Sequence, residues 1–147
     1  MADWRDQLID DPEGIRRIWS ETRRVAVLGI KTEAQGGQPA HYVPEYLQRA
    51  GLEIIPVPVY YPEATTILGQ PVYRKVADVP GPLDMVVVFR RSVDVPPHVD
   101  DLIAARPKTV WMQSGISHAA AAQRLAEAGI QVVQDRCSMV EHRRHAG

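Results

Sequence analysis

The chain has 147 residues, of which 45% are hydrophobic and 24% are charged, and this composition is typical of one globular domain rather than of a disordered or fibrous protein. Its 17 basic and 18 acidic residues give a formal net charge of −1, which provides no general attraction to nucleic acid or anionic lipid. The longest apolar run, residues 85–89, is far shorter than the roughly 20 residues of a membrane span. We therefore expect a single domain over residues 1–147, without a nucleic-acid or membrane partner.

Two features of the sequence indicate the compartment. The first residues are polar and acidic, without the basic start and apolar stretch of a secretory signal. Cys137 is the only cysteine, so the chain cannot form an internal disulfide, as is usual in a reducing compartment. Both features predict a cytoplasmic protein.

The N-terminal part of the chain predicts a helix and then a strand. Asp11 and Pro12 form a typical helix start, and apolar residues at helical spacing continue the helix to about residue 22. We expect this helical segment, residues 1–23, to pack on the domain that follows. Residues 25–30 are apolar without polar alternation, as in a parallel strand that is covered on both faces.

A second helix is predicted after a glycine-containing loop. It is indicated by Val43, Tyr46, Leu47 and Ala50, which follow the i, i+3, i+4, i+7 pattern of one helix face. Gly51 is expected to end this helix, because glycine readily adopts the left-handed conformation that follows a last helical turn.

The middle of the chain is rich in proline. Residues 52–57 form the next predicted strand, and the prolines at its end are typical of a strand end or a sheet edge. Between residues 60 and 82 we expect only a short strand near residues 71–73 and a short helix near residues 75–78.

The second half of the chain alternates again between strands and helices. Residues 85–89 form the clearest strand, and an amphipathic helix precedes Pro107. Residues 109–112 and 130–133 are further predicted strands, separated by an alanine-rich helix over residues 117–128.

This alternation predicts a three-layer α/β/α fold with a doubly wound, mostly parallel, Rossmann-like sheet of five or six strands. We favour the Rossmann strand order, with the flavodoxin order as the alternative. In such sheets, ligands bind beyond the carboxyl ends of the strands, near the point where the strand order reverses. The loops that follow the predicted strands are residues 29–38, 58–61, 89–92, 113–116 and 135–137.

The loop after the first strand has features of a phosphate site. It runs from Gly29 to Gln38 and contains further glycines, and glycines beside free amides at a helix start suit a phosphate or pyrophosphate. It contains neither the dinucleotide-binding glycine motif nor the P-loop motif. On the motif alone, a glycine-rich connection without a ligand is an equal alternative.

Two other strand ends carry basic residues. Phe89 offers an apolar wall for a ring, and Arg90 and Arg91 suit phosphate groups. The alternative is a solvated pair of arginines at a strand end. After the last strand, Arg136 favours the thiolate of Cys137, and the alternative there is a buried, inert cysteine.

Other chemistries have less support in the sequence. The second strand ends without the acidic residue that binds the ribose hydroxyls of NAD, since Glu53 lies at its start. The histidine spacings, including that of His142 and His145, match no metal-ligand set. Ser114 lies outside a nucleophile elbow, and we predict neither a metal site nor a catalytic residue.

Seven short segments, in order along the chain, resemble the stand-alone CoA-binding proteins that are related to the CoA-binding domain of the succinyl-CoA synthetase alpha subunit. These segments are residues 25–29, 39–43, 54–57, 68–69 with 80–81, 87–91 with 94–96, 110–113, and 135–137 with 141–143. The resemblance implies a Rossmann-like fold with coenzyme A bound across the strand ends. It implies cofactor contacts at Gly29, Ile30, Lys31, Gln38, Pro39, His41, Pro56, Val57, Phe89, Arg90, Arg91, Gln113, Ser114, Gly115, Ile116, Arg136 and Cys137.

The chain also departs from the family pattern. Lys31 stands where the family usually has a small hydroxyl residue, Ala40 replaces a common serine, and the first loop is longer. The sequence contains neither a second domain nor a phosphohistidine segment like those of the synthetase, so the resemblance implies binding and not ligase chemistry. We expect a protein that binds coenzyme A or an acyl-CoA without catalysis of its own. The alternatives are an NAD(P)-dependent oxidoreductase or redox sensor on the same fold, and an interaction module that has lost ligand binding.

Overall fold

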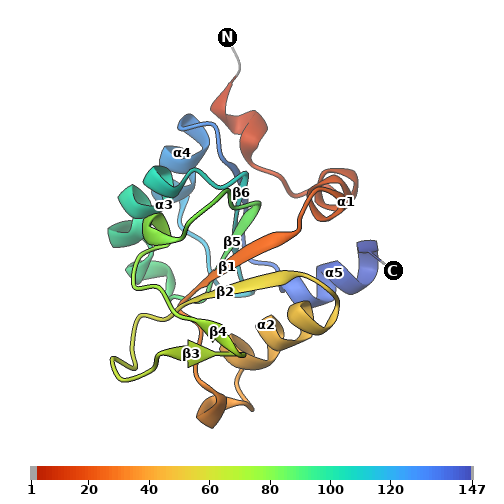
Figure 1. Ribbon diagram of the computed structural model, residues 1–147. Coiled ribbons are helices and arrows are strands. Elements are labelled where there is room, and N and C mark those ends of the chain that lie inside the picture. The colour runs from red at the N-terminus through yellow and green to blue at the C-terminus, as the bar shows by residue number, and fades with distance from the viewer. Residues whose placement is uncertain (1–2, 147) are drawn as a thin grey trace.

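Five parallel strands form the central sheet of the computed structural model, which describes residues 3–146 (Figure 1). They are β1 (Arg24–Leu28), β2 (Glu53–Val57), β5 (Met85–Val88), β6 (Thr109–Met112) and β7 (Gln131–Val133). Their order across the sheet is β2-β1-β5-β6-β7, and each neighbouring pair is parallel. The predicted Rossmann-like α/β fold with a mostly parallel sheet is confirmed.

The strand order corrects one detail of the prediction. Counted along the chain, the five parallel strands have the order 2-1-3-4-5, which is the flavodoxin alternative, whereas the Rossmann order places a further strand beyond the second. In this chain a short antiparallel hairpin follows β2, with strands β3 (Thr66–Ile67) and β4 (Gln70–Pro71). The Tyr73 N–H after β4 donates to the Pro56 carbonyl of β2 over 3.0 Å. Proline residues have no N–H for a strand ladder, and the proline-rich segment after β2 forms a separate hairpin in place of a third parallel strand.

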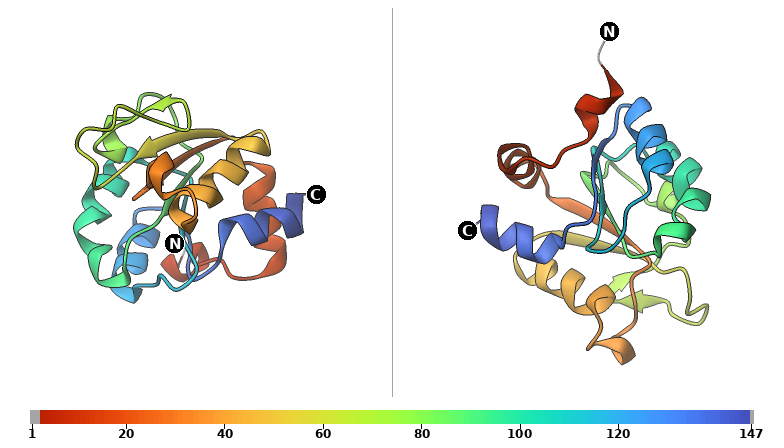
Figure 2. Two further views of the ribbon diagram at one scale, coloured as in Figure 1. Left: turned by 90° about the horizontal axis from the view of Figure 1, so that it is seen from below. Right: turned by 180° about the vertical axis from the view of Figure 1, so that it is seen from behind.

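Helices cover both faces of the sheet, which gives the three layers that were expected (Figures 1 and 2). One face packs against α1 (Pro12–Ser20), α2 (Pro39–Arg49) and α5 (Ser138–Ala146), and the other against α3 (Val99–Ala105) and α4 (Ala119–Glu127). Short 3-10 helices are η1 (Trp4–Gln7), η2 (Glu33–Gln35), η3 (Val76–Asp78), η4 (Ser92–Asp94) and η5 (Pro96–His98). In the described part of the chain, no helix has the length and apolarity that crossing a bilayer requires.

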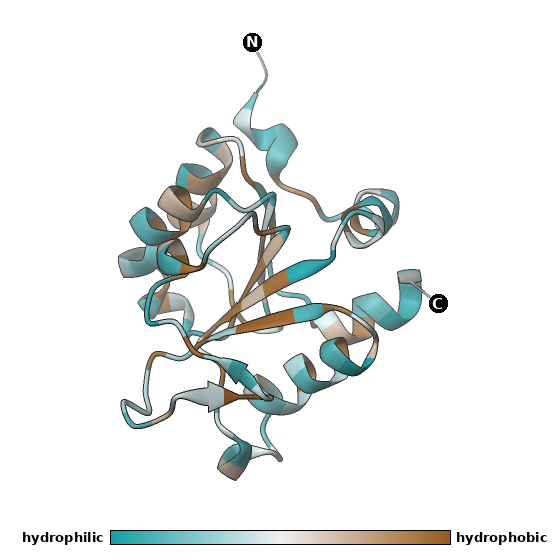
Figure 3. Cartoon of the chain, viewed as in Figure 1, coloured by the Kyte–Doolittle hydropathy of each residue, from teal (hydrophilic) through white to brown (hydrophobic). Residues whose placement is uncertain are grey.

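The apolar strands supply two cores, one on each face of the sheet. In β5, Met85 and Val87 pack toward α1, α2 and α5, whereas Val86 and Val88 pack toward α3 and α4. All four side chains are fully buried. Figure 3 shows mainly hydrophobic strands in the middle and many hydrophilic residues on the helices around them. A strand that is buried on both faces needs no polar alternation, and this explains the continuous apolar runs of the sequence.

Residues 3–23 of the N-terminal segment pack along the far edge of the sheet and over one face, and residues 1–2 lie outside the described part of the chain. The Ile9 N–H donates to the Val132 carbonyl over 2.9 Å, next to a parallel bridge between Leu8 and Val132. In α1, the buried Trp19 ring lies 5.1 Å from the ring of Trp111 in β6. The expected helix therefore forms and covers the α5 side of the sheet.

Candidate functional site

The strand order of the sheet reverses between β1 and β5, because the chain adds β2 on one side of β1 and later adds β5 on the other. Ligands of open parallel sheets bind beyond the carboxyl ends of the strands at such a switch point. A cleft of about 450 Å³ opens there, which we call the switch-point cleft. It is lined by Lys31, Gln38, Pro39, Ala40, Phe89, Arg90, Arg91, Ser92, Gly115 and Ile116.

Gly29 ends β1 and brings the chain close to the end of β5. Its N–H donates to the Val57 carbonyl of β2 over 2.9 Å, and the Phe89 N–H donates to the Leu28 carbonyl over 2.8 Å. The φ angle of Gly29 is +87°, in the left-handed region that only glycine adopts without strain. The loops after β1 and β5 therefore leave the sheet side by side, and both then line the switch-point cleft.

The start of α2 contributes another wall of the cleft. Gln38 is the N-cap residue, but its side chain makes no capping hydrogen bond to the helix. Its Oε1 atom instead accepts a hydrogen bond from the Lys31 ammonium group, and the Lys31 N–H donates to the Ala40 carbonyl over 3.1 Å. The first N–H groups of a helix have no partner within it and favour anions. This wall therefore combines a lysine with the amide of Ala40 at a helix start.

The two arginines after β5 differ in their surroundings. The Arg90 side chain is 15% exposed, and its Nε lies 3.3 Å from Nε2 of His98. Its guanidinium lies 5.5 Å from the centre of the Tyr60 ring. The Arg91 side chain is 80% exposed, and its Nε donates to Asp94 Oδ2 over 2.9 Å. Arg90 is therefore packed between two other side chains, whereas Arg91 is exposed and has one ion pair, with Asp94.

The charges around the switch-point cleft suit an anionic ligand. Of the described residues that line it, Lys31, Arg90 and Arg91 are basic and none is acidic. Asp94 lies outside the lining, and the hydrogen bond from Arg91 together with the charges of both arginines lowers its pKa. Arginine and lysine bind phosphate and carboxylate groups through charge-assisted hydrogen bonds. The cleft can therefore hold a ligand with more than one negative charge.

A larger cleft of about 700 Å³ lies beside the first, on the α3 side, and we call it the outer cleft. It is lined by Leu28, Pro58, Val59, Arg74, Lys75, Ala77, Asp78, Pro97, His98, Asp100, Asp101 and Ala104. His98 belongs to this lining, so the contact between His98 and Arg90 joins the two clefts. Burial, followed by the charge of Arg90, lowers the pKa of His98 and favours its neutral form at pH 7.

Several charges of the outer cleft are already engaged in local structure. Arg74 donates to three carbonyl groups of residues 60–64 at 2.8–3.1 Å. Asp101 accepts hydrogen bonds from the N–H groups of Val76 and Ala77 at 2.8 and 3.0 Å. The outer cleft therefore has apolar walls and a mixed charge, unlike the basic switch-point cleft.

The structure brings about half of the predicted contact residues together. Those that line the switch-point cleft are Lys31, Gln38, Pro39, Phe89, Arg90, Arg91, Gly115 and Ile116. Gly29 supports them from the end of β1. Ser114 is exposed beside Gly115 but does not line the cleft.

The other predicted contact residues face away from this cleft. Ile30, Pro56, Val57 and Gln113 are buried, and the Gln113 amide oxygen accepts a hydrogen bond from the Ser138 N–H. His41 is also buried and lies 3.0 Å from the carboxylate of Glu33 through its Nε2.

Arg136 and Cys137 lie after β7 and are outside the lining of both clefts. Arg136 donates to the Asp10 carbonyl over 2.8 Å and lies 3.5 Å from the Glu141 carboxylate. Cys137 is partly buried against the core under α1, α2 and α5. The structure therefore separates these two residues from the basic residues after β1 and β5.

Sequence reasoning missed two residues that line the switch-point cleft and two that contact Arg90. Ala40 and Ser92 line the switch-point cleft, and Tyr60 and His98 contact Arg90. Ala40 had a signal in its position at the helix start, and Tyr60 lies in a loop that we expected at the strand ends. No signal pointed to His98, because its contact with Arg90 depends on how the chain turns through η4 and η5.

Sequence and structure comparisons with known proteins show the family of this chain. The sequence model of the CoA binding domain matches residues 23–143. The protein YneT of Bacillus subtilis (strain 168) is 34% identical over 128 residues, which cover 87% of this chain and 91% of YneT. In a solved structure, the protein cell-free ID.343 from Thermus thermophilus has 37% sequence identity and a TM-score of 0.84, covering 92% of this chain and 99% of that one.

A more distant match links the fold to a larger enzyme. The dinucleotide-forming acetyl-coenzyme A synthetase 1 of Ca. Korarchaeum cryptofilum matches over 80% of this chain and 26% of its own, with a TM-score of 0.64. At 22% identity this match shows the fold alone. The family match is more specific, because residues 23–143 include all five parallel strands and every residue that lines the switch-point cleft. The chain therefore belongs to the CoA-binding domain family.

Proposed function

We propose that this protein binds coenzyme A or an acyl-CoA in the switch-point cleft and carries out no catalysis of its own. The observation that carries the proposal is the charge of this cleft, whose described lining has three basic side chains and no acidic one. The cleft also lies at the switch point of the sheet, where open parallel sheets bind nucleotides. Membership of the CoA-binding domain family gives independent support.

The pyrophosphate of coenzyme A suits the wall formed by the first loop and α2. The Lys31 ammonium group and the Ala40 N–H lie at this wall, and both groups favour anions. Arg91 faces them from the loop after β5 and is 80% exposed, so it can turn toward a phosphate group at little cost in buried contacts. When a phosphate group replaces Asp94 as its hydrogen-bond partner, the Arg91 guanidinium remains paired with an anion.

The adenine and the remaining phosphate suit the side of the cleft near Arg90. Phe89 lines the cleft and offers an apolar surface to a ring. Arg90 is held by His98 and Tyr60 at the boundary with the outer cleft, which gives room for the adenosine beyond it. The pantetheine arm then runs along Gly115 and Ile116 at the end of β6.

The side chains that line the switch-point cleft support a binding role without catalysis. Among the described residues that line this cleft, Ser92 is the one with a hydroxyl group. The Ser92 Oγ accepts a hydrogen bond from the Ser117 N–H over 3.1 Å. No described residue of this lining is a histidine or a carboxylate that would activate Ser92 as a nucleophile. The chemistry at this site is therefore recognition of phosphate groups.

A thermal-shift panel tests the proposed function against its alternatives. We expect coenzyme A and acetyl-CoA to raise the melting temperature and NAD to leave it unchanged. A ligand at a hundredfold excess over its Kd stabilises the folded protein by about 2.7 kcal/mol. Stabilisation by NAD alone supports the oxidoreductase alternative, and no shift with any nucleotide supports the interaction module. Either result contradicts the proposed function.

A further inference from the structure

Glu33 joins its own loop to the start of α2 and to the hairpin β3–β4, which lies 35 residues further along the chain. Its Oε2 atom lies 3.0 Å from Nε2 of His41 in α2 and accepts a hydrogen bond from the Leu68 N–H over 2.9 Å. We infer that Glu33 is a positioning residue of the proposed CoA site, which fixes the loop carrying Lys31 and Gln38 without touching the ligand. This inference rests on the proposed function and assigns it a residue outside the cleft.

The loop formed by residues 31–38 has few other connections to the rest of the protein. The Lys31 N–H bonds to the Ala40 carbonyl, and the N–H groups of Gln35 and Gln38 bond to carbonyls within the loop. The side chains of Lys31 and Gln38 bond to each other. Within residues 3–146, the hydrogen bond from Leu68 to Glu33 is the one that joins this loop to the hairpin β3–β4. Glu33 therefore supplies an external anchor to an otherwise locally bonded loop.

The anchor on the hairpin is held by hydrogen bonds to two other elements. Leu68 and Gly69 form the two-residue turn of the hairpin with φ angles of +53° and +74°, which is the pattern of a type I′ turn. Leucine is strained in this conformation, and both polar groups of its backbone are held. The Leu68 N–H bonds to Glu33, and the Leu68 carbonyl accepts a hydrogen bond from Gln48 of α2 over 2.9 Å.

His41 gives Glu33 its second fixed contact. The His41 side chain is 5% exposed, and its Nδ1 atom is buried with no hydrogen-bond partner among the described residues. Among the described residues, Glu33 is therefore the one hydrogen-bond partner of the His41 ring. Burial raises the pKa of Glu33, but the hydrogen bonds from His41 and from the Leu68 backbone outweigh it and lower the pKa. The anchor is therefore an ionised carboxylate at neutral pH.

The negative charge of Glu33 and its role as an anchor predict opposite effects of its replacement on the affinity for coenzyme A. Loss of a negative charge near a phosphate site strengthens anion binding if charge alone matters. Loss of the anchor lets residues 31–38 move, so that ligand binding must order Lys31 and Gln38 again, which weakens binding. We expect Glu33→Ala to lower the affinity for coenzyme A about tenfold, and Glu33→Gln, which keeps an acceptor oxygen, to lower it much less.

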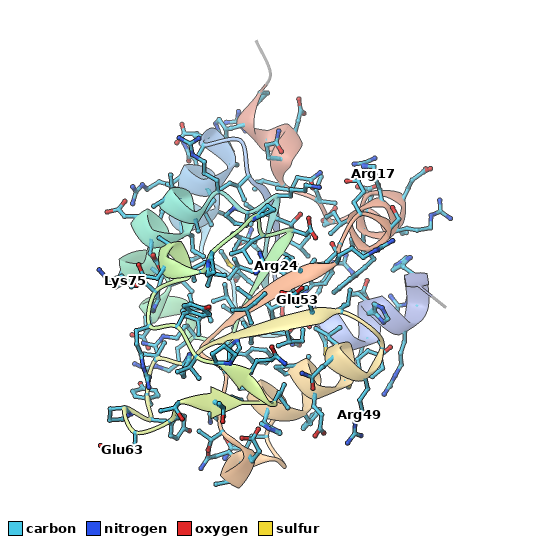
Figure 4. All side chains as sticks on the ribbon, viewed as in Figure 1. Arg17, Arg24, Arg49, Glu53, Glu63 and Lys75 are labelled. Atoms are coloured by element: carbon cyan, nitrogen blue, oxygen red, sulfur yellow. The ribbon has the colours of Figure 1, made fainter. Side chains whose placement is uncertain are left out.

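A double-mutant cycle with Lys31 tests whether Glu33 acts through this loop. In a Lys31→Ala background, we expect Glu33→Ala to have little further effect on affinity, because the side chain that it positions is already absent. In an Arg91→Ala background, the tenfold effect should remain, since Arg91 belongs to another loop. Glu63→Ala is the matched control, because Glu63 is an exposed glutamate near the hairpin (Figure 4) and should change affinity little.

Calorimetry on the full chain and amide hydrogen exchange on the ligand-free protein give separate readouts. The inference is overturned if the wild type binds coenzyme A and Glu33→Ala binds it equally well or more tightly. It is also overturned if the tenfold loss persists in the Lys31→Ala background. If the wild type does not bind coenzyme A, the proposed function fails. In that case, faster exchange of residues 31–38 and Leu68 in Glu33→Ala still supports the anchor, and unchanged exchange rejects it.

Discussion

The Phe89 carbonyl oxygen lies 2.2 Å from the point that a Cβ atom on Gly29 would occupy. Heavy atoms cannot approach so closely, and the φ angle of +87° at Gly29 strains any other residue. The backbone that leaves β1 can therefore pass this close to the end of β5 only because residue 29 is glycine. This contact sets the spacing of the two loops that carry Lys31, Arg90 and Arg91.

Gly29→Ala should lower the free energy of unfolding by about 2 kcal/mol or more, because it adds both backbone strain and a clash with backbone. Chemical denaturation measures this loss. Gly37→Ala is the matched control within the same loop, because a Cβ atom there has no neighbour within 4 Å and the φ angle is not left-handed. Equal stability of the two variants would contradict the close approach.

Arg91→Ala should weaken the binding of coenzyme A by about tenfold to a hundredfold, the usual loss for a charge-assisted hydrogen bond. Folding should be unaffected, because the Arg91 side chain is 80% exposed. Isothermal titration calorimetry measures the affinity, and thermal denaturation without ligand measures the folding. Arg17→Ala removes an arginine from the distant helix α1 (Figure 4) and should leave the affinity unchanged. If Arg91→Ala binds coenzyme A as tightly as the wild type, Arg91 is only a solvated side chain at a strand end and does not contact the ligand.

Arg90→Ala should weaken binding by a similar factor and also lower stability. Arg90 is 15% exposed and lies against His98 and Tyr60, so its loss removes packing as well as charge. The same two measurements separate the effects. A variant that loses stability but keeps its affinity would place Arg90 in the structure of the loop and outside the ligand site.

Cys137 should remain unmodified when the native protein is incubated with CoA disulfide. A mixed disulfide needs the cysteine thiolate to reach the CoA sulfur, and Cys137 is partly buried against the core and outside the lining of the clefts. Mass spectrometry before and after denaturation measures the modification. Ready formation of an adduct in the native state, suppressed by reduced CoA, would instead support a redox-linked site.

The stability of the protein should fall as the pH decreases below about 6.5. Burial lowers the pKa of His142 and of His98 below the ordinary value of 6.5. Below pH 6.5 the unfolded chain therefore binds protons more readily than the folded protein, and acid favours unfolding. The lowered pKa values of Glu33 and Asp84 act in the same direction only at lower pH, below about 4.5.

Chemical denaturation at pH values from 8 to 5 measures this dependence. In His142→Gln, the loss of stability between pH 6.5 and 5 should be smaller, because one partly buried imidazole with a lowered pKa has been removed. Glutamine can still bond to the Tyr46 hydroxyl, which lies 2.8 Å from His142 Nδ1. A stability that is constant or rises on acidification through this range would contradict the prediction.

The fold was largely predictable because its strands are buried on both faces. The residues of β5 and β6 are completely buried, so their apolar runs have a direct physical cause. The ends of the strands were less predictable. β1 ends at Leu28, whereas the apolar run in the sequence continues to Ile30. The close approach of Gly29 to Phe89 ends the strand there, and that contact is not visible in the local sequence.

The site was predictable where it depends on strand ends and less so where it depends on side-chain direction. Lys31 and Arg90 line the cleft because their loops follow β1 and β5. His41 lies in the first turn of α2, and its ring contacts Glu33 of the preceding loop. Likewise, Leu68 adopts a left-handed turn conformation that its residue type disfavours, so the hairpin that anchors the loop had no clear signal.

Isothermal titration of the wild-type protein with coenzyme A, with NAD as the comparison, tests the central claim most directly. The proposed site is a single basic cleft in each chain, so we predict saturable binding of one coenzyme A per chain and no measurable heat with NAD. Raising the salt concentration should weaken this binding, because its main contacts are between charges. Saturable binding of NAD with no binding of coenzyme A would contradict the account.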